Sequence, residues 1–429
     1  MKVAVVGGGG REHALIRKLK ENPAITQMYA LPGNGGIGFD AVCVPLAAGD
    51  LDGIVAFARK EALDFVVVAP DDPLALGLVD RLEAAGIAAF GPTARAAAIE
   101  SSKAFAKDLM KKYGIPTAAY ETFDDARRAA DYLRRNTRWP IVLKADGLAL
   151  GKGVLICENL AAALDGVREI MEDRAFGAAG SRMVVEEFLT GPEVSVLAFT
   201  DGKTLVPMVS SMDHKRAGDG DTGLNTGGMG TVAPNPCYTP AIAAQCREKI
   251  FLPTVAAMNA EGRTFRGCLY FGLMLTPDGP RVIEYNCRFG DPETQVVLPL
   301  LQSDLLTILM AVREGRLAQV PVVFGGGAAA CVVLASGGYP QHCEKGLQIT
   351  SLTDGQLAGA QNVTVYHAGT ARRDGALVTA GGRVLGVTAT ADDLQTALAR
   401  AYAAAAEIHF DGVHYRRDIG RRALSALAQ

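Results

Sequence analysis

Short apolar runs alternate with helix-length segments over the first hundred residues, and this alternation constrains the fold more than any other feature of the chain. Repetition of strand, helix and strand predicts a parallel sheet covered by helices. We therefore expect a Rossmann-like, doubly wound domain over residues 1–101. The expected strands are VAVVG at 3–7, MYALPG at 28–33, DFVVVAP at 64–70 and IAAFGP at 87–92, and the expected helices are 12–20, 50–63 and 74–85.

After residue 101 the order of the expected helices and strands changes. The chain also has 429 residues, which is more than one hydrophobic core usually supports, so we expect several domains. Helices and strands in hairpin order predict an α+β unit over 102–317, and further strands with one helix predict a small C-terminal α+β domain over 318–429. The segment 213–231 is rich in glycine and lacks apolar periodicity, so we expect a functional loop there. The expected helices are 101–113, 124–135, 160–173, 239–261 and 391–407.

Composition excludes several classes of protein. The formal net charge of -3 gives no basic footprint, so nucleic acid is not expected as a partner. No apolar run reaches the length that spans a bilayer, and the chain starts directly with a strand and a glycine turn, so we expect a cytoplasmic protein without a membrane partner. The eight cysteines have no paired spacing and are interpreted as reduced thiols.

The first glycine turn, Gly7 to Gly10, leads directly into a helix whose N-terminal amides could bind an anion. A dinucleotide site is disfavoured, because Glu12 stands where the third glycine of G-x-G-x-x-G belongs. A site for a simpler phosphate is favoured, and a purely structural turn is the alternative.

The segment VIEYNCRFGDPETQ, Val282 to Gln295, concentrates polar chemistry in one strand and its exit loop. Alternate residues of a strand share a face, so Glu284 and Asn286 present two hard oxygen donors side by side, as Mg²⁺ prefers. The Arg288 guanidinium group could then bind a carboxylate or a phosphoryl oxygen in bidentate fashion. The alternative for such a pattern is an edge strand whose polar face meets water.

Three lysines have the placement expected of triphosphate ligands. Lys103 begins a helix, Lys144 ends the apolar strand PIVLKAD, and Lys152 lies in the glycine-rich loop 147–153. A solvated surface lysine is the alternative for each. Lys144 differs, because burying an unpaired ammonium group is costly, and it should have an anionic partner.

A possible nucleoside site follows at VVEEFLTGPE, Val184 to Glu193, where a strand end offers backbone groups to an adenine edge. The order of these features along the chain resembles that of the ATP-grasp superfamily: the lysines come first, then the glycine-rich loop, the acidic strand end and the strand with Glu-x-Asn. That resemblance implies two α+β lobes that hold ATP and Mg²⁺ between them.

Five motifs extend the resemblance to the phosphoribosylamine–glycine ligase family over essentially the whole chain. They are GGREHAL (9–15), PGN (32–34), KADGLALGKGV (144–154), DHKR with DTGLNTGGMG (213–216 and 221–230) and YNCRFGDPETQ (285–295). The resemblance implies a carboxylate–amine ligase of purine biosynthesis that joins glycine to 5-phosphoribosylamine, with ATP and Mg²⁺ (or Mn²⁺). It also implies an ATP-grasp domain over 102–317 with a mobile lid at about 118–190, and we expect a monomer.

Residue roles are carried over position by position. Catalytic roles fall on Arg288, Asp291, Asp213 and Lys215; ATP binding on Lys103, Lys144, Gly151, Lys152, Gly153, Glu186, Glu187, Leu189 and Glu193; substrate binding on Gly9, Gly10, Asn34, Asp71, Asp213 and Arg288; and metal binding on Glu284 and Asn286. The chain departs from the family pattern at Gly8 (usually Asn), at Leu224 (commonly Pro) and at Asp71 (often Glu).

The residues fit a route through an acyl phosphate that needs no protein nucleophile. His214 is expected to make a loop contact and not to act as a general base. Two alternatives are another carboxylate–amine ligase of the superfamily, which would differ in 213–230 and in RFGDPETQ, and a non-catalytic nucleotide-binding regulator, which would lack the metal and phosphate ligands.

Overall fold

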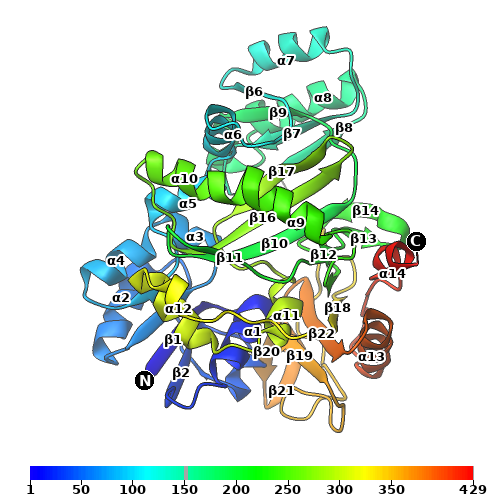
Figure 1. Ribbon diagram of the computed structural model, residues 1–429. Coiled ribbons are helices and arrows are strands. Elements are labelled where there is room, and N and C mark those ends of the chain that lie inside the picture. The colour runs from blue at the N-terminus through cyan, green and yellow to red at the C-terminus, as the bar shows by residue number, and fades with distance from the viewer. Residues whose placement is uncertain (149–152, 429) are drawn as a thin grey trace.

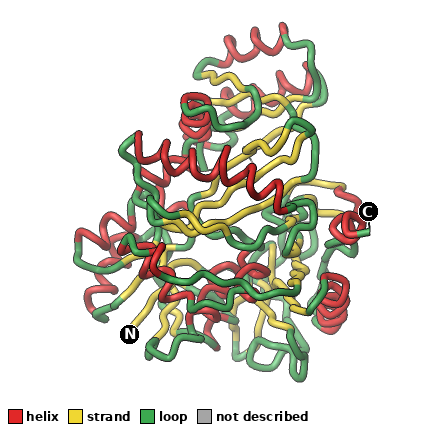
Figure 2. The backbone as a smooth tube through the Cα atoms, in the orientation of Figure 1, coloured by secondary structure: helices red, strands yellow, loops and turns green. Residues whose placement is uncertain are grey.

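The computed structural model describes residues 1–148 and 153–428, and its four larger sheets form four regions of the molecule (Figure 1). Strands fill the interior and helices cover the outer faces of the sheets (Figure 2). Among the described residues, no helix combines the length and apolar character needed to cross a membrane.

The N-terminal region is a five-stranded parallel sheet in the order β3-β2-β1-β4-β5, which confirms the predicted Rossmann-like fold. Alternate residues of β1 enter two different cores, with Ala4 and Val6 on one face and Val3 and Val5 on the other. Continuous apolar runs such as FVVV in β4 follow from this burial on both faces. The elements are β1 (Lys2–Gly7), α1 (Gly10–Leu19), β2 (Gln27–Pro32), β3 (Val42–Cys43), α2 (Leu51–Lys60), β4 (Phe65–Val68), α3 (Asp71–Ala75), α4 (Leu78–Ala84), β5 (Ala89–Phe90) and α5 (Ala94–Ser101).

A second sheet, antiparallel and in the order β6-β9-β7-β8, forms the lobe at the top of Figure 1. Helices α7 and α8 pack together over one face and bury a separate small core around Leu133, Leu143 and Ile170. Helix α6 connects this lobe to the N-terminal region. The elements are α6 (Lys103–Lys112), β6 (Tyr120–Phe123), α7 (Ala126–Arg135), β7 (Ile141–Ala145), β8 (Val154–Cys157), α8 (Leu160–Val167) and β9 (Met183–Glu187).

The central sheet runs β11-β10-β16-β17 and carries the segment with the metal-type donors. The turn Thr276 to Gly279 joins β16 to β17, as the Thr-Pro-Asp-Gly sequence predicts, and a bulge interrupts their pairing between Gly272 and Leu273. Helices α9 and α10 lie over this sheet (Figure 1). The elements are β10 (Glu193–Thr200), β11 (Leu205–Pro207), α9 (Pro240–Cys246), α10 (Leu252–Ala260), β16 (Gly267–Thr276), β17 (Gly279–Asn286), α11 (Thr294–Val297) and α12 (Leu305–Glu314).

The last sheet, β12-β15-β18-β22-β19, corrects the expectation that 213–231 is a loop without secondary structure. Strand β15 pairs with β18, about a hundred residues further along the chain, and β13 pairs with β14 as a small hairpin. Such short strands carry no local periodicity, because their pairing is non-local. The elements are β12 (Met212–Asp213), β13 (Arg216–Gly218), β14 (Thr222–Asn225), β15 (Gly230–Ala233), β18 (Ala328–Ala335), β19 (Val363–His367), β20 (Thr370–Arg373), β21 (Ala376–Thr379), β22 (Arg383–Ala391), α13 (Leu394–Glu407) and α14 (Arg421–Leu427).

One single helix expected from the sequence is wrong in detail. The segment 74–85 contains the end of α3 and the whole of α4, because Gly77 adopts a left-handed conformation (φ 85°) that ends the first helix. The helix expected over 239–261 is confirmed, because α9 and α10 are joined without interruption by one wider helical turn over Arg247–Phe251.

Candidate active site

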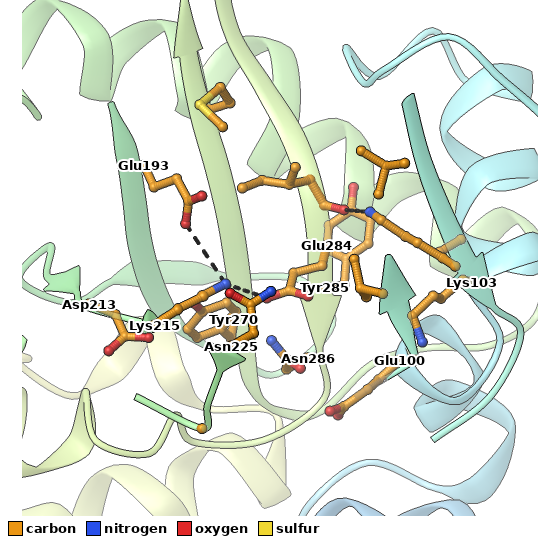
Figure 3. Close-up of a pocket in the computed structure, with 18 of the residues that line it drawn as sticks. Glu100, Lys103, Glu193, Asp213, Lys215, Asn225, Tyr270, Glu284, Tyr285 and Asn286 are labelled. Atoms are coloured by element: carbon orange, nitrogen blue, oxygen red, sulfur yellow. Dashed lines mark hydrogen bonds and ion pairs between the residues drawn. The ribbon is translucent and has the colours of Figure 1, made fainter. Parts of the chain in front are cut away.

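A cavity of about 760 Å³ lies where the upper lobe, the central sheet and the C-terminal sheet meet. Each region contributes to its lining: α3 gives Asp71, α6 gives Lys103, β17 gives Glu284, and β22 gives Arg383. In Figure 3, Lys103 and Lys215 approach from opposite sides, and Glu284 and Asn286 lie between them.

Glu186 is buried between two lysines at one wall of the cavity. Its carboxylate lies 3.0 Å from Lys144 Nζ and 2.8 Å from Lys107 Nζ, so the expected anionic partner of Lys144 is confirmed. Burial opposes ionisation of Glu186, but the charges of Lys144 and Lys107 outweigh it and hold the pKa of Glu186 below its ordinary value. Desolvation lowers the pKa of Lys107 to about 8. The Glu186 side chain therefore positions two cations, whereas the resemblance assigns it to the nucleoside.

Lys107 was not predicted from the sequence, although its spacing from Lys103 indicates it. It follows Lys103 by four residues on α6, and residues at this spacing lie on the same face of a helix. Both lysines line the cavity.

Lys103 lies at the N-terminus of α6 and is tied to the glycine-rich loop. Its Nζ donates to the carbonyl oxygen of Gly147 at 2.8 Å, and Asp146 accepts from Ser102 Oγ and from the Ala104 amide. These bonds attach the start of the loop to the start of the helix. Gly153 lines the cavity, whereas the predicted ligands Gly151 and Lys152 lie outside the described residues.

Glu284 and Asn286 both line the cavity from β17, where they present a carboxylate and an amide oxygen. Lys215 lies 3.2 Å from Glu284 and 3.8 Å from Glu193, and its charge lowers the pKa of Glu284 to about 2. In the described part of the chain, no group of three His, Cys, Asp or Glu residues could hold a metal ion. Two hard oxygen donors fit a Mg²⁺-type ion that takes its other ligands from nucleotide phosphates and water.

Asp213 and Glu293 place two carboxylates close together at the opposite end of the cavity. Burial and the neighbouring charge of Glu293 raise the pKa of Asp213 well above its ordinary value. Glu293 is 4% exposed, and one of its oxygens accepts from Tyr270 at 3.1 Å and from Ser195 at 3.4 Å. Such a pair favours a cationic group between or beside the carboxylates. Sequence analysis missed Glu293 and Tyr270, although Glu293 lies within the motif RFGDPETQ.

Arg288 and Asp291 are each held by a residue from another part of the chain. Glu100, at the end of α5, lies 3.1 Å from Arg288 Nη2, and Arg288 also donates to Asn286 Oδ1 at 3.2 Å. Arg383 of β22 lies 3.0 Å from Asp291 and also donates to the Asp291 carbonyl oxygen. Neither Glu100 nor Arg383 belongs to a motif in the sequence, so only the fold identifies them.

Three predicted substrate ligands, Gly9, Gly10 and Asn34, lie outside the cavity lining as the structure describes it. The Gly9 amide donates to Glu12 within its own turn at 2.6 Å. The Asn34 side chain donates to the carbonyl oxygens of Gly8 and His367 and accepts from two backbone amides of the next turn. These residues support the site from behind.

The remaining predicted ligands lie in the cavity wall. Asp71 lines it from the first turn of α3, and Glu187 faces Arg281 at 3.0 Å. Leu189 and Glu193 line the same wall, beyond the end of β9.

Comparison with known proteins covers nearly the whole chain. Models of the N domain, the ATP-grasp (A) domain and the C domain of phosphoribosylglycinamide synthetase match residues 1–100, 101–294 and 329–422. The phosphoribosylamine–glycine ligase of Synechocystis is 49% identical over 428 residues, covering 99% of this chain and 100% of the relative. The chicken trifunctional purine biosynthetic protein adenosine-3 is 48% identical over all of this chain, which spans 43% of that protein.

Solved structures agree with the sequence matches. The crystal structure of phosphoribosylamine–glycine ligase from Thermotoga maritima has a TM-score of 0.86 at 35% identity, covering 98% of this chain and 100% of that chain. A biotin carboxylase domain from Hydrogenobacter thermophilus, solved with ADP and magnesium, has a TM-score of 0.74 at 17% identity over 96% of this chain and 91% of that one. The second likeness shows the fold alone.

The lobes, and the cavity that they enclose with lysines on its walls, define the class: an ATP-grasp enzyme, which uses ATP. This confirms the predicted fold class. The chain belongs to the phosphoribosylamine–glycine ligase family and is an ATP-dependent ligase of purine biosynthesis.

Proposed function

We propose that the chain joins glycine to 5-phosphoribosylamine, giving glycinamide ribonucleotide, ADP and phosphate through a glycyl phosphate intermediate. The observation that carries this proposal is the cavity itself. Its lining includes Lys103, Lys144, Glu284 and Asn286 as well as the carboxylates of Asp213 and Glu293, and this supports an ATP–metal site beside a site for an amino acid. A ligase that activates an amino acid with ATP needs both sites.

ATP takes the wall formed by the upper lobe and the central sheet. Lys103 and Lys144 face its phosphates, while Glu187, Leu189 and Glu193 surround the nucleoside. Domain limits of 1–101, 102–317 and 318–429, with a lid at about 118–190, are part of this proposal. We also propose that the chain acts as a monomer.

Glu284 and Asn286 would hold the divalent metal, Mg²⁺ or Mn²⁺, which neutralises developing charge on the phosphates when bound. Lys215 now neutralises Glu284 at 3.2 Å, so metal binding needs this ammonium group to turn toward another anion. Glu193, at 3.8 Å from the same ammonium group, is one such anion within reach.

Glycine takes the other end of the cavity. Its ammonium group relieves the repulsion between Asp213 and Glu293, and Arg288 faces its carboxylate and the phosphoryl group. The carboxylate oxygen then attacks the γ-phosphorus atom and ADP leaves. The amine of phosphoribosylamine attacks the acyl carbon, and the C–O bond to phosphate breaks as the C–N bond forms.

Release of ADP tests the proposed reaction. The protein is assayed with Mg²⁺, ATP, glycine and freshly prepared phosphoribosylamine, and each component is omitted in turn. We expect ADP only in the complete mixture, and ADP release that is independent of glycine would rule the reaction out.

Isotope transfer tests the intermediate. Glycine labelled with ¹⁸O in its carboxylate should deliver one labelled oxygen to the released phosphate, because the attacking oxygen stays with phosphorus. Unlabelled phosphate, with labelled product amide only, would contradict a glycyl phosphate.

A further inference from the structure

A second cavity, of about 330 Å³, lies on the opposite side of the N-terminal region from the C-terminal sheet. It opens where α4, the start of α5, the turn between α10 and β16, and α12 come together, on the left of Figure 1. No residue of its lining belongs to the active-site cavity in the described part of the chain. Its lining is Val79, Asp80, Glu83, Ala89, Phe90, Gly91, Thr93, Arg95, Gly262, Arg263, Thr264, Arg266, Val312 and Arg313.

Positive charge in this cavity exceeds negative charge, with four arginines against two acids. Within residues 1–148 and 153–428, Arg95, Arg263 and Arg266 form no ion pair. Arg263 instead donates to the carbonyl oxygen of Arg95 at 2.7 Å, which holds these two residues side by side. Guanidinium groups that outnumber the neighbouring carboxylates repel one another, and an anion among them reduces that repulsion.

The two acids of the lining, Asp80 and Glu83, do not neutralise the four arginines. Asp80 accepts a hydrogen bond from the Ala94 amide at 2.8 Å and so serves the start of α5. Glu83 lies 3.9 Å from Arg313 Nε, which is too far for a hydrogen bond.

Arg313 adds an independent observation. Its Nε is buried, and it finds no acceptor among the described residues. A buried donor without an acceptor costs free energy, which a ligand oxygen at this position would recover. Arg313 is carried by α12, and Arg95 by α5, so two of the four guanidinium groups belong to helices.

We propose that this cavity binds a small phosphate-bearing anion. Guanidinium groups pair with phosphoryl oxygens in bidentate fashion, and several of them converge here from three different segments of the chain. The volume suits a phosphorylated metabolite or a mononucleotide rather than a macromolecule. Val79, Phe90 and Val312 supply an apolar floor against which a sugar or a base packs.

An anion bound in this cavity contacts two regions of the protein at once. Arg95 belongs to the N-terminal region, whereas Arg263 and Arg266 lie just before β16 of the central sheet, so one anion bridges the two regions. The Arg263 guanidinium also lies 4.7 Å from the centre of the Phe105 ring on α6, the helix that begins with Lys103. A bound anion therefore stabilises the junction that supports the phosphate-binding helix.

Binding is measured by calorimetry on the full chain at constant ionic strength, with inorganic phosphate, pyrophosphate and AMP as probes and saturating ADP and Mg²⁺ in the active site. The test variant is Arg95→Met/Arg266→Met, in which both altered side chains are exposed. The control is Arg127→Met/Arg138→Met, which removes the same charge from two exposed positions of the upper lobe.

We expect at least one probe to bind the wild type and the control equally, and to bind the test variant roughly tenfold or more weakly. The probe that binds most tightly then identifies the phosphate source. Basal ligase activity without added probe should be unchanged in the test variant, which separates this result from failure of the proposed reaction. Equal binding to the test variant and the wild type, or no binding by any probe, overturns the proposal.

Discussion

Arg288 depends on Glu100, a residue far from it in the sequence. The Glu100 carboxylate pairs with Arg288 Nη2 at 3.1 Å and accepts from the Cys287 amide at 2.7 Å, so it fixes both the side chain and the backbone of the segment. Glu100 thereby positions the guanidinium group that we propose faces the phosphoryl transfer.

Replacing Glu100 by Gln should lower kcat by roughly 10- to 100-fold, because the amide keeps the bond to Cys287 but loses the ion pair that aims Arg288. The KM for ATP should change little, since Glu100 does not touch the lysines of the phosphate wall. Steady-state kinetics provide the measurement, and Glu248→Gln, at an exposed acid outside both cavities, is the control. A variant with unchanged kcat would contradict this role.

The role of a single residue could be predicted from the sequence where it depends on the residue's immediate neighbours in the chain. Lys144 ends a buried strand, so a partner was required, and Glu186 supplies it. Asn34 is predicted as a ligand from its motif, and the sequence does not show that its side chain also bonds to Gly8, His367 and the following turn. Contacts between residues 34 and 367 depend on how distant segments dock, which no local pattern encodes.

At the scale of elements, the hairpin β13–β14 is held in place by Arg416. This side chain is buried, pairs with Asp221 at 2.9 Å, and donates to the Arg216 carbonyl oxygen at 3.1 Å. Asp418 orients the same guanidinium at 2.7 Å. The hairpin follows directly on Asp213 and Lys215, so its position affects both.

Arg416→Met should release this hairpin while leaving the rest of the chain folded. We expect faster proteolytic cleavage within 216–225 and a severalfold higher KM for glycine. Limited proteolysis and kinetics measure the two effects. Arg417→Met, at the exposed next position, should behave as wild type, and equal cleavage of the two variants would refute the assignment.

Helix α6 and strand β9 are joined by the pair of Lys107 and Glu186, both nearly fully buried. Lys107→Met should lower the free energy of unfolding by roughly 3 kcal/mol, because it removes one of two cations from a buried carboxylate. Urea unfolding provides the measurement, with exposed Lys111→Met as the control. Adding Glu186→Gln should restore part of the loss, and a strictly additive double variant would count against this coupling.

Elements with local signals were predicted well and those with remote partners were not. Strands β16 and β17 are joined by a recognisable turn, whereas β15 finds its partner β18 about a hundred residues later. The expected loop at 213–231 failed for that reason. The helix break at Gly77 was missed because amphipathic spacing does not reveal the left-handed conformation of that residue.

At the scale of the whole molecule, His214 connects the glycine-rich segment to the C-terminal end. Its Nδ1 donates to the Gly230 carbonyl oxygen and its Nε2 accepts from the Gly420 amide, so the neutral ring is required. It makes the structural contact that the sequence suggested. Burial and the charges of Arg422 and Arg416 lower the pKa of His214 to about 4.

Stability should therefore fall in mild acid. Between pH 6.5 and 4 the unfolded chain binds a proton at His214 and the native chain does not, so the free energy of unfolding decreases as pH falls, by about 3 kcal/mol from this residue. Urea unfolding at pH 7 and pH 4.5 measures the change. His214→Gln should flatten this dependence and exposed His409→Gln should not; an equally steep profile for His214→Gln would exclude the mechanism.

Strand order in the C-terminal sheet also bears on synthesis of the chain. Asp213 lies on β12, which pairs with β15, and β15 in turn pairs with β18 and through it with β22. Arg383, which holds Asp291, is itself the first residue of β22. A nascent chain on the ribosome thus carries the wall that we propose binds ATP long before the end that we propose binds glycine can form. The chain therefore cannot use ATP to activate glycine until almost all of its residues have been translated.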